Sequence, residues 1–151
     1  MSIQKSSTEE KFLIAIARMR NILIRDIDRL LQQHDITTTQ FSVLEVLYSK
    51  GEQCVGDIQK RILGTNGNIP VVIHNLEKNG YVMRQKSNQD GRISIIKLSN
   101  EGKKIMEILY PMQQQRLQTL LQNVDKTELD ILNKQLKTIF DNIVEIQERE
   151  E

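Results

Sequence analysis

The sequence has no tryptophan, one cysteine, two prolines and only 4% aromatic residues. One cysteine cannot form a disulfide within the chain, which excludes a small fold stapled by disulfides. Long hydrophobic runs are missing too, since none approaches the roughly 20 residues that a membrane-spanning helix needs. Met1 to Glu10 lack the basic start and apolar stretch of a signal peptide. We therefore expect residues 1–151 to form a single domain in the cytoplasm, with no membrane contact.

Net charge is also nearly absent, because 21 basic residues offset 20 acidic ones and leave a formal charge of +1. The positive and negative charges are concentrated in different parts of the chain. Residues 58–104 carry nine Lys and Arg against three Asp and Glu, a net charge of +6, and the rest of the chain carries −5. A basic segment flanked by acidic ones is expected where one face of a protein meets phosphate. A solvated basic face explains the charge equally well, so the order of the elements must decide.

Apolar residues at steps of three and four predict amphipathic helices at both ends of the chain. The first helix is predicted over Glu9 to Gln33. Two further helices are indicated by apolar sets from Ile105 to Leu117 and from Leu129 to Ile146, the last with a seam like that of a coiled coil. Between the two ends, Thr37 and Gln40 form a capping box for a helix from Thr38 to about Lys50.

The central segment predicts a helix-turn-helix. A short helix over residues 55–63 is followed by a turn and a second helix that ends at Asn79-Gly80. Thr65 and Asn68 are alternative caps for this second helix. With Thr65 as the cap, Pro70 would remove one helical hydrogen bond; with Asn68 as the cap, Pro70 would fall at the second helical position and cost little.

Two strands are predicted after this helix, over residues 81–86 and 92–98, joined by a turn that contains Asp90-Gly91. Ser99 is then a candidate cap for a helix beginning near Asn100. The expected fold class is mainly α with a small β-hairpin wing: a winged helix-turn-helix with long helices at both ends.

The second helix of the pair has a distinct inward stripe, formed by Ile69, Ile73 and Leu76. The remaining positions point largely outward: Asn66, Asn68, Pro70, Val71, His74 and Asn75. Asparagine can make paired hydrogen bonds to adenine, and a valine can pack on a thymine methyl group. Each of these residues is also an ordinary surface residue, so this face alone does not establish base contact.

The segment from Ile36 to Gly102 resembles the winged helix-turn-helix core of the MarR family of bacterial transcriptional regulators. The matching pieces are Ile36-Thr37-x-x-Gln40, Asn75-Leu76-Glu77-Lys78-Asn79-Gly80-Tyr81-Val82, Asp90-Gly91-Arg92 and Ile96-x-Leu98-Ser99-x-x-Gly102. Their order and spacing carry the resemblance, and the long terminal helices extend it over nearly the whole chain. The stretch from Lys50 to Tyr81 is similar to a subgroup that includes repressors responding to catechols and quinones.

This resemblance implies an obligate homodimer, with a DNA-binding lobe over residues 36–102 and a helical dimerisation region over residues 9–33 and 103–147. It also implies a repressor that binds a pseudo-palindromic double-stranded DNA operator and is released by a small aromatic or phenolic effector or by a redox signal. The residues assigned to DNA by position are Thr65, Asn66, Asn68, Pro70, Val71, His74, Asn75, Lys86 and Arg92. Arg92 would enter the minor groove, with Asp90 holding it or the wing turn in shape. Pro70 and Val71 stand where family members often have threonine and arginine, which indicates weaker or differently directed base readout.

Three further residues allow two interpretations each. Cys54 lies in an expected polar loop before the short helix, where an incidental cysteine is favoured over a redox sensor because Glu52 and Asp57 disfavour a thiolate. Met19 and Met106 lie on apolar helix stripes, where core or dimer packing is favoured over an adaptable effector pocket.

Enzymatic chemistry has no motif in this sequence. His34 and His74 are isolated, so no metal site is expected, and there is no nucleophile motif or phosphate-binding glycine loop. We expect no cofactor and no enzyme. Two alternatives to a DNA-binding regulator stay open at this point: a helical protein-interaction module, such as an adaptor or anti-activator, that uses a winged fold without DNA, and a small thiol enzyme built on Cys54.

Overall fold

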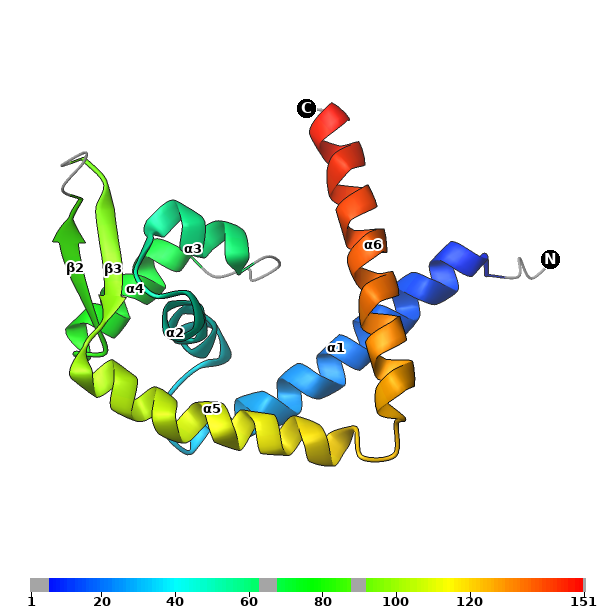
Figure 1. The fold of residues 1–151 in the computed structure, drawn as a ribbon, viewed down its shortest axis with the longest axis horizontal. Helices are drawn as coiled ribbons and strands as arrows, with labels where there is room; N and C mark the ends of the chain where they lie inside the picture. Colours follow the sequence, from blue (N-terminus) through cyan, green and yellow to red (C-terminus); the bar gives the residue numbers. More distant parts are fainter. Residues whose placement is uncertain (1–5, 63–67, 88–91, 151) are drawn as a thin grey trace, which may run out of the picture. The chain divides into compact units, whose positions relative to one another are not determined.

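The computed structural model describes residues 6–62, 68–87 and 92–150. In these residues the elements follow the order α1 (Thr8–Gln32), α2 (Thr38–Lys50), β1 (Gln53–Cys54), α3 (Val55–Arg61), α4 (Ile69–Lys78), β2 (Val82–Lys86), β3 (Ser94–Leu98), α5 (Asn100–Leu120) and α6 (Lys126–Glu150) (Figure 1). The chain divides into two compact units, Met1–Gln113 and Gln114–Glu151, and α5 runs from the first into the second. The predicted class, mainly helical with a small wing and long terminal helices, is confirmed.

Capping residues set the starts of the first two helices. The Ser7 hydroxyl accepts a hydrogen bond from the Glu10 N–H at 3.2 Å, and the Glu10 carboxylate accepts one from the Ser7 N–H at 2.8 Å. Thr37 and Gln40 form the same reciprocal pair at the start of α2, as predicted. Both pairs satisfy backbone donors that a helix start leaves without partners.

The wing is larger than predicted. Instead of a two-stranded hairpin, the structure has a three-stranded antiparallel sheet in the order β1-β3-β2. The β2–β3 ladder runs from the pair Val82↔Leu98 to the pair Lys86↔Ser94, and the added strand β1 pairs Gln53 with Ile96 and Cys54 with Ile95. The segment before α3, expected to be a loop, therefore forms the edge of the sheet. In addition, α3 ends at Arg61 rather than at residue 63.

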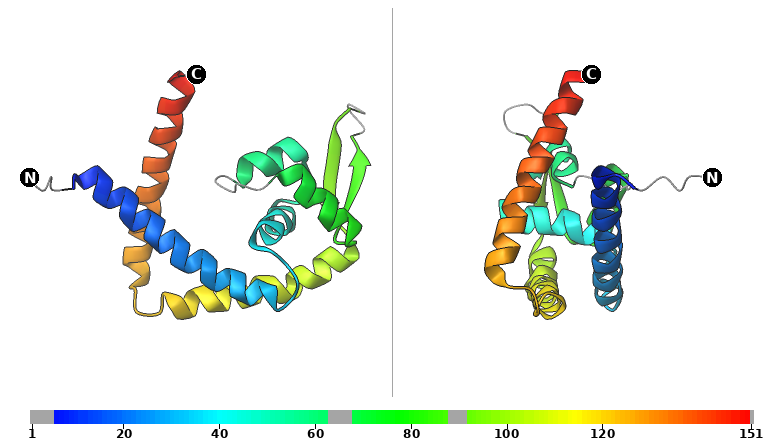
Figure 2. Two further views of the ribbon diagram at one scale, coloured as in Figure 1. Left: turned by 180° about the vertical axis from the view of Figure 1, so that it is seen from behind. Right: turned by 90° about the vertical axis from the view of Figure 1, so that its right-hand side faces the viewer.

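Helix α2 lies at the centre of the first unit (Figure 2) and contacts α1, α3, α4 and β3. Its side chains Phe41, Leu44 and Leu47 are buried, as are side chains from α4, β3 and α5 that complete the core: Ile73, Leu76, Ile96, Met106 and Leu109. Fully burying one such side chain contributes about 1.5–3 kcal/mol of transfer free energy. This core holds the helix-turn-helix and the sheet as one unit.

Two long helices keep large apolar side chains exposed. On α6 they share one side of the helix: Ile131, Leu132, Ile139, Phe140, Ile143 and Ile146, each between 38% and 56% exposed. On α1 the exposed apolar residues are Phe12, Leu13, Ile14, Met19, Ile22 and Ile24, which are distributed around the helix. An exposed apolar face such as that of α6 marks an interaction site rather than a solvated helix. None of the helices in the described ranges is long and apolar enough to cross a membrane.

Candidate nucleic-acid interface

The start of α4 depends on Asn68. Asn68 is the N-cap, and its side-chain oxygen accepts a hydrogen bond from the Val71 N–H at 3.5 Å. Pro70 therefore lies in the first turn, where its missing N–H breaks no helical hydrogen bond. Of the two caps left open by the sequence, the structure selects Asn68. Thr65 and Asn66 lie outside the described residues.

The two faces of α4 are separated as predicted. Ile69, Ile73 and Leu76 are at most 2% exposed and pack into the core. The opposite side, which we call the outward face of α4, consists of exposed residues: Asn68, Pro70, Val71, His74 and Asn75. Val71 is 51% exposed, although an apolar side chain on a solvated helix is normally turned inward. An exposed valine among amides is suited to a thymine methyl contact.

The cap limits what Asn68 can read. A paired contact to adenine uses both the oxygen and the NH₂ group of an asparagine side chain. In α4 the Asn68 oxygen already accepts from the Val71 N–H, which leaves one of its lone pairs and both NH₂ hydrogens without a partner in this bond. A paired adenine contact by Asn68 would therefore have to share the oxygen with the helix cap. Asn75, exposed on the same face, is the better candidate for paired adenine recognition.

The wing carries exposed basic groups next to α4. Lys86 ends β2, and Arg92 precedes β3. Toward the wing tip the ladder continues with a hydrogen bond from the Ser87 N–H to the Ile93 carbonyl at 2.9 Å. Nearer its base, Arg84 on β2 pairs with Glu77 on α4 at 3.5 Å, a half-exposed ion pair worth at most about 1 kcal/mol. Asp90, predicted to support the wing, lies outside the described residues.

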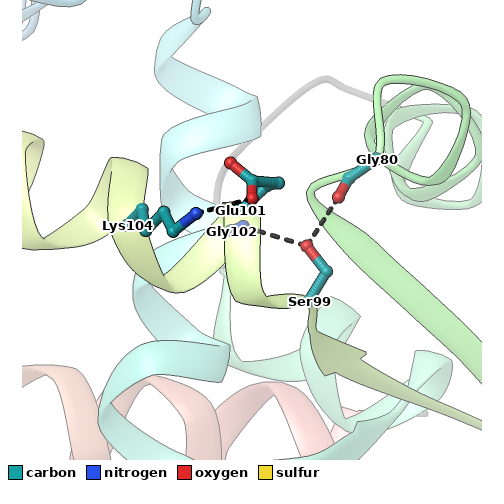
Figure 3. A network of polar contacts seen from close by, with 5 residues as sticks. All are labelled: Gly80, Ser99, Glu101, Gly102 and Lys104. Carbon is teal, nitrogen blue, oxygen red and sulfur yellow. Dashed lines mark hydrogen bonds and ion pairs between the residues drawn. The ribbon is translucent and has the colours of Figure 1, made fainter.

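The base of the wing joins the end of α4 to the start of α5 (Figure 3). The Ser99 hydroxyl donates to the Gly80 carbonyl at 2.5 Å and accepts from the Gly102 N–H at 2.9 Å. On the same turn of α5, Lys104 pairs with Glu101 at 2.9 Å, and this hydrogen bond raises the pKa of Lys104 above its usual value. Ser99 was predicted as a helix cap, but its bond to Gly80 was not. The sequence motif Leu98-Ser99-x-x-Gly102 contains both residues of this junction, and it is the sequence signal that could have indicated the contact.

With this geometry in place, known proteins can be compared with the chain. Residues 26–109 match the protein family described as "Transcriptional regulator SarA/Rot". The HTH-type transcriptional regulator YkoM of Bacillus subtilis is 32% identical over 106 residues, which cover 70% of this chain and 69% of that protein. The crystal structure of a MarR family regulator from Silicibacter pomeroyi superposes with a TM-score of 0.81 at 22% identity, covering 96% of this chain and 99% of that one. The chain belongs to the MarR/SarA family of winged helix-turn-helix regulators.

Two other solved structures bear on ligands of this fold. Sco3205, a MarR family regulator from Streptomyces coelicolor solved in complex with DNA, has a TM-score of 0.80 at 17% identity and covers 93% of this chain and 91% of that one. NadR, solved in complex with 4-hydroxyphenylacetate, has a TM-score of 0.76 at 22% identity and covers 92% and 96%. As a MarR/SarA family member, the protein is a DNA-binding transcriptional regulator and not an enzyme. This excludes both the thiol enzyme and the module without DNA binding.

In this MarR/SarA protein Cys54 is not in a loop. It is the second residue of β1, opposite Ile95, and it is also the N-cap of the seven-residue helix α3. Its half-buried thiol sulfur accepts a hydrogen bond from the Asp57 N–H at 3.4 Å. The loop expectation is wrong because pairing with β3 makes the segment extended. The sulfur therefore caps the first turn of α3.

The two methionines considered for an effector pocket lie in different environments. Met106 on α5 is fully buried in the core of the first unit, whereas Met19 on α1 is 43% exposed. Core packing, the favoured interpretation, holds for Met106. In residues 6–62, 68–87 and 92–150 no group of three His, Cys, Asp or Glu side chains could hold a metal ion.

A cavity of about 400 Å³ lies between the end of α2, the end of β3 and the first turns of α5. Tyr48, Lys97 and Lys103 contribute to its lining, together with the carboxylates of Glu52 and Glu107. The Tyr48 ring also contacts the Tyr110 ring, with centroids 5.6 Å apart and planes tilted by 48°. The two lysines and two glutamates give this lining no net formal charge beside its aromatic surface. The sequence analysis missed this cavity because no periodic pattern marks it.

Proposed function

We propose that the protein is a homodimeric repressor that binds a pseudo-palindromic DNA operator in the cytoplasm. Each protomer would place α4 in the major groove and its wing, with Lys86 and Arg92, against the adjacent backbone and minor groove. The observation that carries this proposal is the outward face of α4, which is exposed and held at its N-terminal end by the Asn68 cap. N-terminal residues of a recognition helix are the ones that reach base edges.

The exposed apolar residues on α1 and α6 support the dimer. Both helices carry large apolar side chains that a lone protomer leaves in water. Burying them against a second copy would recover roughly 25 cal/mol for each Å² of apolar surface. We therefore assign dimerisation to residues 9–33 and 103–147 and DNA binding to residues 36–102.

Release by a small aromatic or phenolic effector is the regulatory part of the proposal. The cavity beside Tyr48 offers a ring that would stack on an aromatic group. Its lysines are candidate partners for a carboxylate, and its glutamates are candidate acceptors for a phenolic hydroxyl. The complex of NadR with 4-hydroxyphenylacetate shows that one protein of this fold takes such a compound. The protein would have one conformation that binds DNA and one that does not. To release the operator, the effector must have the higher affinity for the conformation that does not bind DNA.

Selection of bound duplexes from a random DNA pool tests the operator. We expect an inverted repeat whose half-sites lie about one helical turn apart, and sedimentation should give a dimer at the same protein concentration. Val71→Ala should weaken the preference at one base pair of each half-site. Recovery of unrelated sequences, or a folded monomer that binds DNA, would contradict the proposal. Repeating the binding with 4-hydroxyphenylacetate, for the unaltered protein and for Lys103→Ala, tests the effector cavity.

A further inference from the structure

We propose that Ser99 and Gly102 are positioning residues for operator binding. They join the end of the recognition helix α4 to the first turn of α5, and through this joint they set the spacing between the two recognition helices of the dimer. The inference rests on the proposed dimeric function. It concerns two residues at the base of the wing rather than at its tip (Figure 3).

The joint begins with the way α4 ends. Gly80 has φ of +77°, and the chain closes with hydrogen bonds from the Tyr81 N–H to the Leu76 carbonyl at 2.9 Å and from the Gly80 N–H to the Glu77 carbonyl at 3.0 Å. These two bonds form a Schellman motif, which fixes the direction in which the chain leaves a helix. The carbonyls of Gly80 and Tyr81 consequently have defined positions relative to α4.

Ser99 binds both of these carbonyls. Its hydroxyl donates to Gly80, its backbone N–H donates to Tyr81 at 3.0 Å, and the same hydroxyl accepts from the Gly102 N–H inside α5. A single hydroxyl therefore bonds to the end of α4 and to the first turn of α5. The adjacent pair Val82↔Leu98 closes the β2–β3 ladder with buried side chains on both strands.

Gly102 permits the close approach that these bonds require. A Cβ atom at position 102 would lie 2.0 Å from the Tyr81 carbonyl oxygen and 3.2 Å from a methyl group of Leu98. Only a residue without Cβ lets α5 come this near to the chain that leaves α4. The first turn of α5 and the end of α4 thus meet through backbone atoms, which have far less freedom to adjust than side chains.

The joint has a geometric consequence for a dimer. Helix α5 continues from Ser99 into residues 103–147, to which we assign dimerisation, so its angle to α4 determines where each recognition helix lies on the duplex. Removal of the Ser99 hydroxyl leaves the bond between the Ser99 N–H and Tyr81 as a pivot. Because Met106 and Leu109 of α5 would stay buried, the helix-turn-helix and the start of α5 would remain folded together. The direction in which α5 leaves the joint would vary, and the two recognition helices would no longer keep one separation.

Operators with altered spacing provide the test. The duplex selected by the unaltered protein is remade with one or two base pairs added to or removed from the spacer, and affinity is measured for each length. One added base pair moves the half-sites apart by about 3.4 Å and rotates them by about 35°. The unaltered protein should bind one spacer length best, with a steep loss on either side. Ser99→Ala should bind that duplex about tenfold more weakly, and its affinity should vary less with spacer length.

Two variants serve as controls. Ser99→Thr keeps a hydroxyl on the same carbon and should match the unaltered protein within about twofold at every spacer length. Ser7→Ala also removes a capping hydroxyl, at the start of α1, and should leave the spacing profile unchanged. An unchanged profile for Ser99→Ala overturns the inference, as does a loss of equal size at all spacer lengths, which would mean a lower folded fraction only. If the unaltered protein selects no duplex at all, the proposed function fails instead.

Discussion

Replacing Gly102 by alanine should destabilise the protein, whereas the same replacement at Gly56 should stabilise it. Both glycines lie in the first turn of a helix, Gly102 in α5 and Gly56 in α3. A Cβ atom at Gly56 would meet only the Cys54 sulfur, at 4.0 Å. At Gly102 the new atom would lie 2.0 Å from the Tyr81 oxygen and 3.0 Å from its carbon. The pair isolates the effect of close backbone approach from helix propensity.

The magnitude follows from the bonds that the clash would break. Cβ atoms essentially never approach another heavy atom more closely than 3.0 Å, so the backbones must separate by about 1 Å. That movement takes the two hydrogen bonds that cross the joint out of range, from the Ser99 N–H to Tyr81, now 3.0 Å, and from the Ser99 hydroxyl to Gly80. Two bonds at about 1 kcal/mol each, less the gain of about 0.5–1 kcal/mol for alanine in a helix, leave a net loss of roughly 1–1.5 kcal/mol. Gly56→Ala keeps only the gain.

Thermal and urea unfolding, followed by circular dichroism at one fixed protein concentration, measure both variants. A fixed concentration matters because the midpoint of a dimer depends on it. For a chain of this size, 1 kcal/mol shifts Tm by about 2–4 °C. Gly102→Ala should lower Tm by roughly 2–6 °C, and Gly56→Ala should raise it by a few degrees at most. Shifts of the same sign at both positions would refute the reasoning from close approach.

Three further predictions concern the DNA interface and the core. Arg92→Ala should flatten the salt dependence of operator binding, because each phosphate that a cation neutralises adds about 0.9 to the slope of log affinity against log salt, and an unchanged slope would contradict the wing assignment. Asn68→Ser keeps a capping oxygen but loses the amide donors, so it should preserve Tm and relax base preference at one position, whereas a shift in Tm without a change in preference would mean that Asn68 is a cap only. Burial raises the pKa of Glu45 above its ordinary value of 4.5, because a partly buried carboxylate is less well solvated than one in water. The charged carboxylate therefore lowers the stability of the fold at neutral pH, and this loss of stability disappears below pH 4.5, where the group is protonated in both states. Glu45→Gln should therefore raise the urea midpoint at neutral pH and converge with the unaltered protein in acid; equal midpoints throughout would refute it.

Local signals explain which parts of this fold could be predicted. The Thr37–Gln40 box involves atoms only three residues apart, so the sequence contains the whole interaction. The inward stripe of α4 likewise follows from helical periodicity, and the burial of Ile73 and Leu76 confirms it. The resemblance to the MarR family depends on the order and spacing of short motifs of this kind. The family assignment confirms the resemblance.

The missed features depend on distant partners. Gln53 and Cys54 form a strand only because they pair with the edge of β3. Two residues are too few to show the alternation of apolar and polar side chains that indicates a strand. The choice between Thr65 and Asn68 as the cap was open because asparagine and threonine are both preferred at helix N-caps. The bond from Ser99 to Gly80 joins residues far apart in the chain, so the sequence could mark Ser99 as a cap without showing its second partner.

The distribution of charge separates two tasks within the proposed interface. The outward face of α4 carries amides, a proline, a valine and a histidine, and no Lys, Arg, Asp or Glu. The exposed cations nearby lie beyond this face: Lys78 in the last turn of α4, Lys86 and Arg92 on the wing, and Lys60 and Arg61 at the end of α3. Phosphate contacts supply affinity and salt dependence, whereas base contacts supply specificity. In this protein the wing and α3 would therefore supply the first and α4 the second. The near-neutral net charge says little against DNA binding, because the exposed cations of the wing and α3 lie beside an outward face of α4 that has no Lys, Arg, Asp or Glu.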